Sequence, residues 1–426
     1  MKRSIPQKMA ILSLALLGFV LSANVTAQSC PFLPGCLDPT FGTGGKVTIQ
    51  FPISPTGSAT GPLDMAIQSD GKILELLYEN KIVRLNADGT LDQAFGSGGV
   101  ATFFWPVTSG SIAYANAMRL QDVGGQQRIV VAGKAHLVSG RKVSNILRMG
   151  RFMPDGTVDT SFGTGGTVII NGASAATEME IQADGKMVML DDAGNLIRTN
   201  ANGSLDIGFG TGGKVSTGYL QDIAIDGNGG IVVGGNVTTG KGNNTRTMMA
   251  VKRYTSGGVA DTAFGTAGTA TADFNTSNNP FGKLAVDPFG NIVAAGQVTA
   301  PGNGQYYFAA ARFTSNGLAD TFFGGTGKVK YVGASGSGRG VLIQSDGKVV
   351  LTGTLNSNYG LVRYNYDGTL DSTFGNSGSV IEDVDLVDYV NSWALQMDPA
   401  CACSKIVMSS YGGGFAGVSF ARFTVQ

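Results

Sequence analysis

Few side chains in this sequence could support nucleophilic or histidine-based catalysis. His136 is the only histidine among the 426 residues, so a Ser-His-Asp mechanism, a Cys-His mechanism or a histidine metal site would have to use it. No Gly-x-Ser-x-Gly, phosphate-binding loop or His-Glu-x-x-His sequence occurs. We expect residues 134–145 to form a surface loop in which His136 is solvated. The sequence therefore disfavours these enzyme classes.

A recurring aspartate and phenylalanine form the next candidate set. They belong to the phrase Leu-Asp-x-x-Phe-Gly, which occurs with minor variation seven times, starting at residues 37, 91, 158, 205, 260, 319 and 370. The carboxylates could be considered for structural calcium, but no Asp-x-Asp-x-Asp-Gly ligand run exists. A group present in every repeat serves every repeat, so we expect the Asp to cap a turn. We expect the Phe to anchor its loop between neighbouring repeats, and we predict no metal or cofactor.

Two further phrases keep step with the first and define the elements between them. One is an apolar stretch, Asp-Gly-Lys and a second apolar stretch, as in 66–74; the other begins with Arg and ends in Asp-Gly, as in 363–368. In the first unit the pattern predicts strands over 46–51, 64–68, 73–77 and 81–86, with Asp-Gly as a hairpin turn. Four short strands in a repeat of roughly 55 residues are typical of a propeller blade. We therefore predict an all-β, seven-bladed β-propeller with four antiparallel strands per blade.

The chain termini indicate a closed ring rather than an open solenoid. Residues 422–426 match 84–88, where the Arg phrase begins, and 34–38 match 88–92, where it continues into Leu-Asp. The last unit therefore stops where the first one starts. A solenoid would need atypical capping repeats instead.

The combination of these phrases resembles the delta-60 repeat family of bacterial extracytoplasmic proteins. The resemblance covers about 37–426, with Gly257-Gly258 and Asn316-Gly317 standing in for Asp-Gly, and with Ala260 and Ala319 replacing Leu. It implies the repeat and an extracytoplasmic location. It implies no particular activity.

The N-terminus has the pattern of a secretory signal peptide. Lys2, Arg3 and Lys8 precede an apolar run over 9–21, which is too short to span a bilayer. We expect cleavage after Ala27, leaving residues 28–426 as a single propeller domain that is secreted or periplasmic; a lipoprotein modified at Cys30 is the alternative. The mature chain has a net charge of −3, which disfavours nucleic-acid binding. No further transmembrane segment is predicted, and we expect a monomer.

Four cysteines fall at the two ends of the propeller: Cys30, Cys36, Cys401 and Cys403. An even number in an exported chain indicates disulfides. The strand alternation places the segment before the first blade and the turn containing the last two cysteines on the same face of the ring. We therefore predict two disulfides between them, either Cys30–Cys401 with Cys36–Cys403 or the swapped pairing. Two local bridges are the less favoured alternative, because a Cys-x-Cys bridge is strained.

The two faces of the predicted ring differ in variability. The repeated phrases lie on one face, and loops of variable length lie on the other, where binding commonly resides. Aromatic and basic side chains there suit a glycan or a peptide. The candidate binding residues are Trp105, Tyr114, Arg141, Arg246, Tyr306, Tyr307 and Trp393.

These patterns favour a secreted, non-catalytic binding scaffold for a protein or glycan partner. The alternatives are a propeller hydrolase or lyase with a carboxylate-based central site, and a structural envelope component. A cluster of acidic residues in the central channel would reverse the preference for binding over catalysis.

Overall fold

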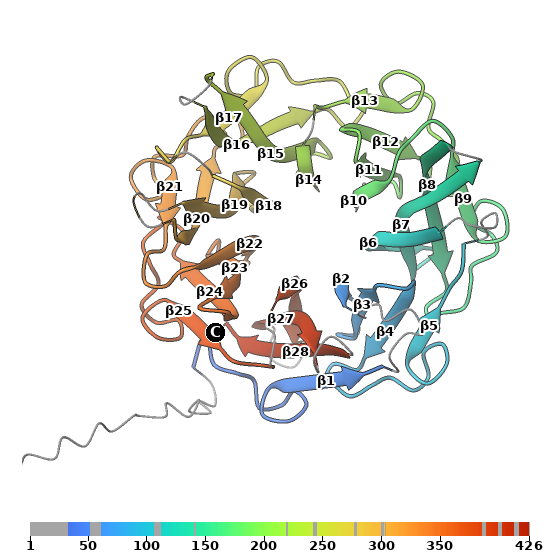
Figure 1. The fold of residues 1–426 in the computed structure, drawn as a ribbon, viewed down its shortest axis with the longest axis horizontal. Coiled ribbons are helices and arrows are strands. Elements are labelled where there is room, and N and C mark those ends of the chain that lie inside the picture. The colour runs from blue at the N-terminus through green and yellow to red at the C-terminus, as the bar shows by residue number, and fades with distance from the viewer. Residues whose placement is uncertain are drawn as a thin grey trace, which may run out of the picture.

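The computed structural model is a ring of seven four-stranded antiparallel sheets arranged like the blades of a propeller (Figure 1). It describes residues 33–425 except 52–60, 106–111, 140–141, 219, 242–244, 277–278, 300–301, 303, 386–388, 399–402 and 413–416. The predicted signal peptide, 1–27, lies outside the described residues. The predicted fold class is confirmed.

Each of the first six blades contains four consecutive strands, counted from the channel outwards. Blade 1 consists of β2 (Pro62–Ile67), β3 (Ile73–Leu77), β4 (Lys81–Leu85) and β5 (Val100–Thr102). The following blades contain, in the same order, β6 (Ile112–Val123), β7 (Gln126–Ser139), β8 (Lys142–Phe152), β9 (Thr167–Ile170); β10 (Ala176–Ile181), β11 (Met187–Asp191), β12 (Asn195–Thr199), β13 (Lys214–Ser216); β14 (Leu220–Ile225), β15 (Ile231–Thr239), β16 (Arg246–Tyr254), β17 (Thr269–Ala272); β18 (Phe281–Val286), β19 (Ile292–Thr299), β20 (Tyr306–Phe313), β21 (Lys328–Lys330); and β22 (Gly336–Ile343), β23 (Val349–Leu355), β24 (Asn358–Tyr364), β25 (Ser379–Glu382).

The seventh blade closes the ring with strands from both ends of the chain. It contains β26 (Val390–Asp398), β27 (Cys403–Gly412) and β28 (Gly417–Thr424), and its outer strand is β1 (Lys46–Gln50), which pairs with β28. Leu37 forms a bridge with Phe423, and Asp38 N donates to Arg422 O at 2.8 Å. The predicted closure is confirmed, and it leaves every blade with four strands.

The grouping of strands into blades differs from the sequence-based expectation by one strand. The first strand of each predicted unit is the outer strand of the preceding blade: β5, for example, pairs with β4. The Leu-Asp-x-x-Phe-Gly loop causes this, because Arg84 N donates to Gly99 O and Asp92 N donates to Arg84 O, which turns the chain back on itself. The repeat in the sequence and the blade in space are therefore offset.

The recurring aspartate and phenylalanine are structural, as predicted. In blade 1, Asp92 Oδ1 accepts from Ala94 N, which caps the turn, and Asp92 Oδ2 accepts from Arg84 Nε at 2.8 Å. The guanidinium lies 4.5 Å from the centre of the fully buried Phe95 ring and donates to Pro154 O in blade 2. We call this group of an arginine, its aspartate partner and the adjacent phenylalanine the Arg-Asp-Phe staple. It occurs in all seven blades, with ion-pair distances of 2.6–2.9 Å.

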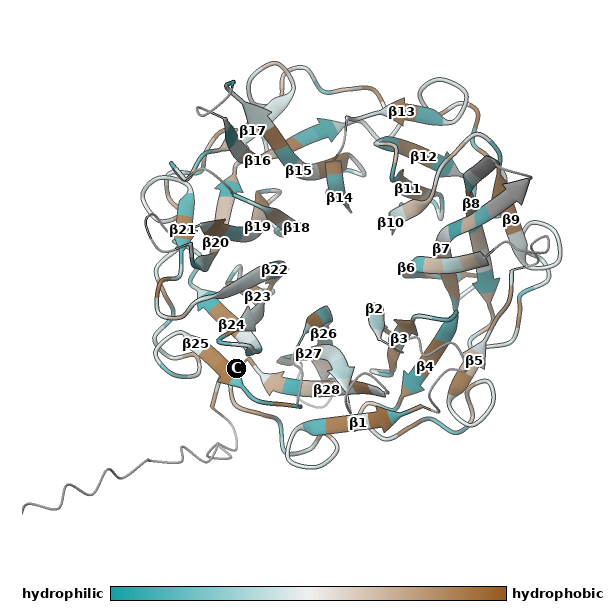
Figure 2. Cartoon of the chain, in the orientation of Figure 1, coloured by the Kyte–Doolittle hydropathy of each residue, from teal (hydrophilic) through white to brown (hydrophobic). Residues whose placement is uncertain are grey.

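The hydrophobic core is divided into clusters that each combine buried side chains of two neighbouring blades. Figure 2 shows hydrophobic residues in strands all around the ring. Phe162, from the loop of blade 2, packs with Met187 and Ile197 of blade 3, and all three are fully buried. Burying such a side chain contributes about 1.5–3 kcal/mol. Each staple thus holds an aromatic ring in the groove of the next blade.

The segment predicted as a loop over 134–145 is instead a continuation of two strands. β7 and β8 pair from Ile129 with Phe152 out to Ser139 with Lys142. His136 therefore lies within β7 and is half-buried, with its ring 6.1 Å from that of Tyr114. The expectation of a fully solvated loop histidine is wrong, because cross-strand pairing encloses one side of the ring. In the part of the chain that the structure describes, no helix has the length and apolar character needed to cross a bilayer.

Candidate functional site in the central channel

The innermost strand of every blade has the same irregularity near its start. A register shift, as in a β-bulge, occurs between Pro62 and Asp64 in β2 and at the equivalent place in the other six blades. Bulges redirect side chains and are common next to functional sites. The residue that follows this irregularity is Asp64, Ala117, Glu178, Asp222, Gly340 or Ser392 in six blades, and Lys283 occupies the aligned position in β18.

Charged residues at this level form two ion-pair groups. Arg119 of blade 2 donates from Nη1 to Asp64 of blade 1 at 2.7 Å and from Nε to Glu180 of blade 3 at 2.9 Å. Lys283 of blade 5 pairs with Asp222 of blade 4 at 3.1 Å and with Glu178 of blade 3. Four carboxylates therefore share two cations.

Two of the carboxylates also accept backbone hydrogen bonds from the next blade. Asp64 Oδ2 accepts from Met118 N at 2.8 Å, and Asp222 Oδ2 accepts from Leu284 N at 2.7 Å. Each of these backbone hydrogen bonds fixes the position of an aspartate against the neighbouring blade. Glu178 and Glu180 accept no backbone hydrogen bond among the described residues, so each glutamate has fewer hydrogen-bond donors than the two aspartates.

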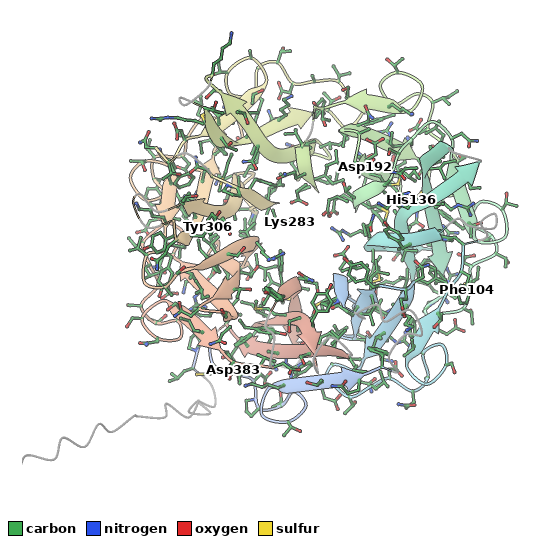
Figure 3. All side chains as sticks on the ribbon, in the orientation of Figure 1. Phe104, His136, Asp192, Lys283, Tyr306 and Asp383 are labelled. Carbon is green, nitrogen blue, oxygen red and sulfur yellow. The ribbon has the colours of Figure 1, made fainter. Side chains whose placement is uncertain are left out.

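The charged side chains line a cavity of about 550 Å³ together with Asn116, Asn391 and Trp393. Figure 3 shows Lys283 at the inner margin of the ring, toward the channel. Trp393 fits because Gly340 of the neighbouring blade, which is aligned with Ser392, has no side chain to collide with the indole. The cavity thus combines carboxylates, two cations, amides and one aromatic ring.

Enclosure of the cavity shifts the titration of its glutamates. Desolvation raises the pKa of Glu178 to about 7, and the attraction of Lys283 only partly offsets this effect. Desolvation also raises the pKa of Glu180, against the pairing with Arg119. Both effects follow from the cost of partly removing a charge from water, since the side chains of Glu178 and Glu180 keep 17% and 26% of their exposure. Glu178 can therefore gain or lose a proton near neutral pH.

A further glutamate lies behind the cavity wall at the ring closure. Glu75 on β3 is fully buried and accepts from Ser392 Oγ at 2.9 Å and from Ser409 Oγ at 3.2 Å, both on blade 7. No salt bridge reaches Glu75 within the described chain. Burial raises the pKa of Glu75 well above its ordinary value, and the serine hydrogen bonds oppose this effect. Burial thus favours the neutral form of this carboxyl.

The two tryptophans predicted to form a binding surface do not lie on the variable face. Trp105 is only 4% exposed and packs against Phe103, with their ring centres 5.8 Å apart. The expectation that it is open to a ligand is wrong, because the segment after β5 folds into the interface between blades 1 and 2. Trp393 lies in β26 and lines the channel cavity.

The remaining predicted residues are dispersed around the ring. Tyr114 packs against His136, Arg246 is exposed and pairs with Asp273 at 2.9 Å, and Tyr306 is 38% exposed at the start of β20. Tyr307 donates to Gln305 Oε1, and Arg141 lies outside the described residues. The structure does not bring these residues together into one site.

Two of the four cysteines, Cys36 and Cys403, lie on opposite sides of β28. Cys36 O accepts from Thr424 N at 2.9 Å, and Thr424 pairs across the sheet with Lys405, two residues after Cys403. Cys30 and Cys401 lie outside the described residues. Cys403 is disulfide-bonded, and Cys36 is not its partner, so the predicted Cys36–Cys403 bridge is not present. A bridge between the N-terminal segment and blade 7 through another pair of the four cysteines stays a prediction.

Metal binding finds no geometric support in the described ranges, where no group of three or more His, Cys, Asp or Glu side chains is arranged to hold an ion. The acidic channel residues face arginine and lysine partners instead.

The channel cluster could have been found by aligning the seven repeats on the turn glycine of the Asp-Gly phrase. Asp64, Glu178, Asp222 and Lys283 each lie seven residues before such a glycine, namely Gly71, Gly185, Gly229 and Gly290. At this position of the innermost strand, a charged residue stands among apolar or small neighbours. That contrast between repeats is the sequence signal that would have indicated the cluster.

Comparison with known proteins supports a β-propeller family and leaves the function open. A family model described as a domain of unknown function (DUF5122) beta-propeller matches residues 77–95, 128–162, 290–323 and 344–374. No match was found among curated proteins.

Solved structures share the fold at low sequence identity. A catalytically inactive variant of virginiamycin B lyase from Staphylococcus aureus, with quinupristin, is 11% identical, with a TM-score of 0.50 over 89% of this chain and 99% of that one. The WD40 β-propeller domain of Doa1 is 10% identical, with a TM-score of 0.52 over 89% and 97%. These likenesses show the architecture alone.

Proposed function

We propose that the protein is a secreted binding module that recognises a small, positively charged group in its central channel. The observation that carries the proposal is the charge of the cavity, whose described lining residues include four carboxylates and two cations, Arg119 and Lys283. Each of these cations is already shared between two carboxylates. The site therefore has an excess of negative charge that an amine or guanidinium would balance.

The other lining groups suit the same ligand. The amides of Asn116 and Asn391 offer donors and acceptors, and the indole of Trp393 offers an aromatic surface. A cation near an aromatic face gains about 0.5–2 kcal/mol. An amino group on a small molecule, on a peptide end or on an amino sugar has the required chemistry. This proposal keeps the binding role but moves the site from the variable loops to the channel.

The excess negative charge also makes acid–base chemistry a second candidate. Glu178, with a pKa of about 7, lies beside Asp222 through their shared Lys283. A carboxyl group that titrates near neutrality can act as a general acid or base. The acidic cluster therefore makes a hydrolase or lyase the second candidate, and binding is placed first because each of the four carboxylates is paired with Arg119 or Lys283.

One experiment tests both candidates. A panel of small amines, neutral sugars and carboxylates would be screened by ligand-observed NMR against residues 28–426 and against the Glu178→Gln and Asp222→Asn variants. Binding of amines that is lost in the Asp222 variant supports the channel site. Chemical conversion of a bound compound that is lost in the Glu178 variant, while binding persists, supports the enzyme. Hits that bind all three proteins equally would contradict both.

Secretion rests on the signal-peptide pattern of residues 1–27 and is tested separately. N-terminal sequencing of the exported protein should begin at Gln28. A start at a lipid-modified Cys30 would support the lipoprotein alternative.

A further inference from the structure

A second cavity, of about 790 Å³, lies at the rim between blades 2 and 3. It is bounded by the Ser161–Thr164 part of the blade 2 loop, by β9 and by the Asn202–Ser204 turn of blade 3. The hydrogen bond from Gly163 N to Asn202 O joins the two loops. The channel residues take no part in this cavity, so it is a separate place for a ligand.

Arg148, on β8, lines this cavity and is 94% buried. Its Nε has no hydrogen-bond partner, and the described residues offer no salt bridge or hydrogen bond to the rest of its guanidinium. Burial alone lowers its pKa, because no acidic group compensates. The seven staple arginines differ, since each of them has an aspartate partner.

A buried cation without a counter-charge is unfavourable, and native structures normally pair it. The cavity has no carboxylate among its described lining residues, so none of these residues supplies that charge. Its polar groups are hydroxyls and amides. Two of them, the Thr164 hydroxyl and Asn202 Nδ2, donate to no other described group and are available as donors.

We propose that this rim cavity is an oxyanion site, in which Arg148 binds a phosphate, sulfate or carboxylate group of a ligand and Thr164 and Asn202 contribute hydrogen bonds. Arginine suits planar, bidentate recognition of such groups. The rim cavity would bind an anionic group of a ligand, whereas the channel is proposed to bind a cationic group. The rim proposal does not depend on the channel proposal.

The test follows the Arg148 Nε–Hε resonance together with the backbone amide resonances of Gly163 and Gly203, which line the cavity and are present in every variant, in ¹⁵N-labelled protein while sulfate, phosphate or acetate replaces chloride at constant ionic strength. The expected result is a saturable shift with at least one of these ions. Arg148→Met should weaken that binding at least tenfold, whereas Arg246→Met, which removes an exposed arginine elsewhere, should leave it unchanged. Comparing the three ions identifies which oxyanion is preferred.

Two outcomes would overturn the proposal: a shift that is linear and the same for all anions, or saturable binding that survives in the Arg148 variant. If Arg148→Met fails to fold, the Thr164→Ala/Asn202→Ala double variant keeps the arginine in place. It should then weaken binding severalfold, and unchanged affinity would count against the site.

Discussion

Lys283 on β18 reaches past blade 4 to pair with Glu178 on β10, while the same ammonium pairs with Asp222 on β14 at 3.1 Å. One side chain thus joins three consecutive blades at the channel. Its two partners differ in their surroundings, because Asp222 also accepts a backbone hydrogen bond and Glu178 does not.

Removing this lysine should destabilise the ring. In Lys283→Met, two carboxylates lose their shared cation, and we expect a loss of about 2–3 kcal/mol in the free energy of unfolding at pH 8. Adding Glu178→Gln should recover part of that loss, because one uncompensated charge is removed. Denaturant unfolding of the single and double variants measures this, with the exposed Lys330→Met as the control, expected within 0.5 kcal/mol of the parent. Strict additivity of the two changes would contradict the coupling.

The Arg-Asp-Phe staple should contribute more where it is more deeply buried. The side chains of Arg151 and Asp159 in blade 2 are 5% and 7% exposed, whereas Arg253 and Asp261 in blade 4 are 24% and 22% exposed. We expect Arg151→Met to cost about 3–5 kcal/mol, because it leaves a buried carboxylate short of its main partner. Arg253→Met should cost about 1–2 kcal/mol. Equal losses in thermal or denaturant unfolding would show that burial does not set the contribution.

Glu75 should make stability fall as the pH rises. Its folded pKa is raised well above the unfolded value, so the folded state holds the proton more tightly. The folded state is therefore favoured at low pH and loses this advantage as the pH rises above the unfolded value, near 4.5, toward the folded one. In Glu75→Gln the side chain keeps its size and shape but can no longer ionise. This variant should therefore have a higher melting temperature than the parent protein at pH 8. At pH 4.5 the two proteins should be nearly alike, and an equal shift at both pH values would point to packing instead.

The predicted bridge between the N-terminal segment and blade 7 should staple the ring where its two ends meet. Peptide mapping without reduction should find the N-terminal segment, with Cys30 and Cys36, linked to the turn that contains Cys401 and Cys403. In the chain-entropy model, closing a loop of this length contributes on the order of 4–5 kcal/mol, so reduction should lower the melting temperature. Four free thiols, or only local bridges, would rule the staple out.

The sequence predicts this fold well because the fold is repeated. Turn signals such as Asp70-Gly71 and the Arg84–Asp92 phrase recur seven times, and repetition averages out local ambiguity. The offset between repeat and blade was missed because pairing of β4 with β5 depends on hydrogen bonds that the phrase itself does not specify.

The site was harder to predict than the fold, because it arises from residues that are distant in the chain. Lys283 and Glu178 are separated by 105 positions, and the arrangement of blades 3 to 5 around the channel brings them together. Trp105 was misplaced for the opposite reason: an aromatic residue in a variable segment gives no sign of whether it faces water or the neighbouring blade.

Binding of an amine as a function of pH tests the channel most directly. Because Glu178 titrates near pH 7 beside Lys283, a bound cation should favour its charged form. An amine identified by the NMR screen should therefore bind several-fold more tightly at pH 8 than at pH 6, and Glu178→Gln should abolish that dependence. An affinity that does not change with pH in the parent protein, or a dependence that persists in Glu178→Gln, would contradict recognition of a cation in the channel.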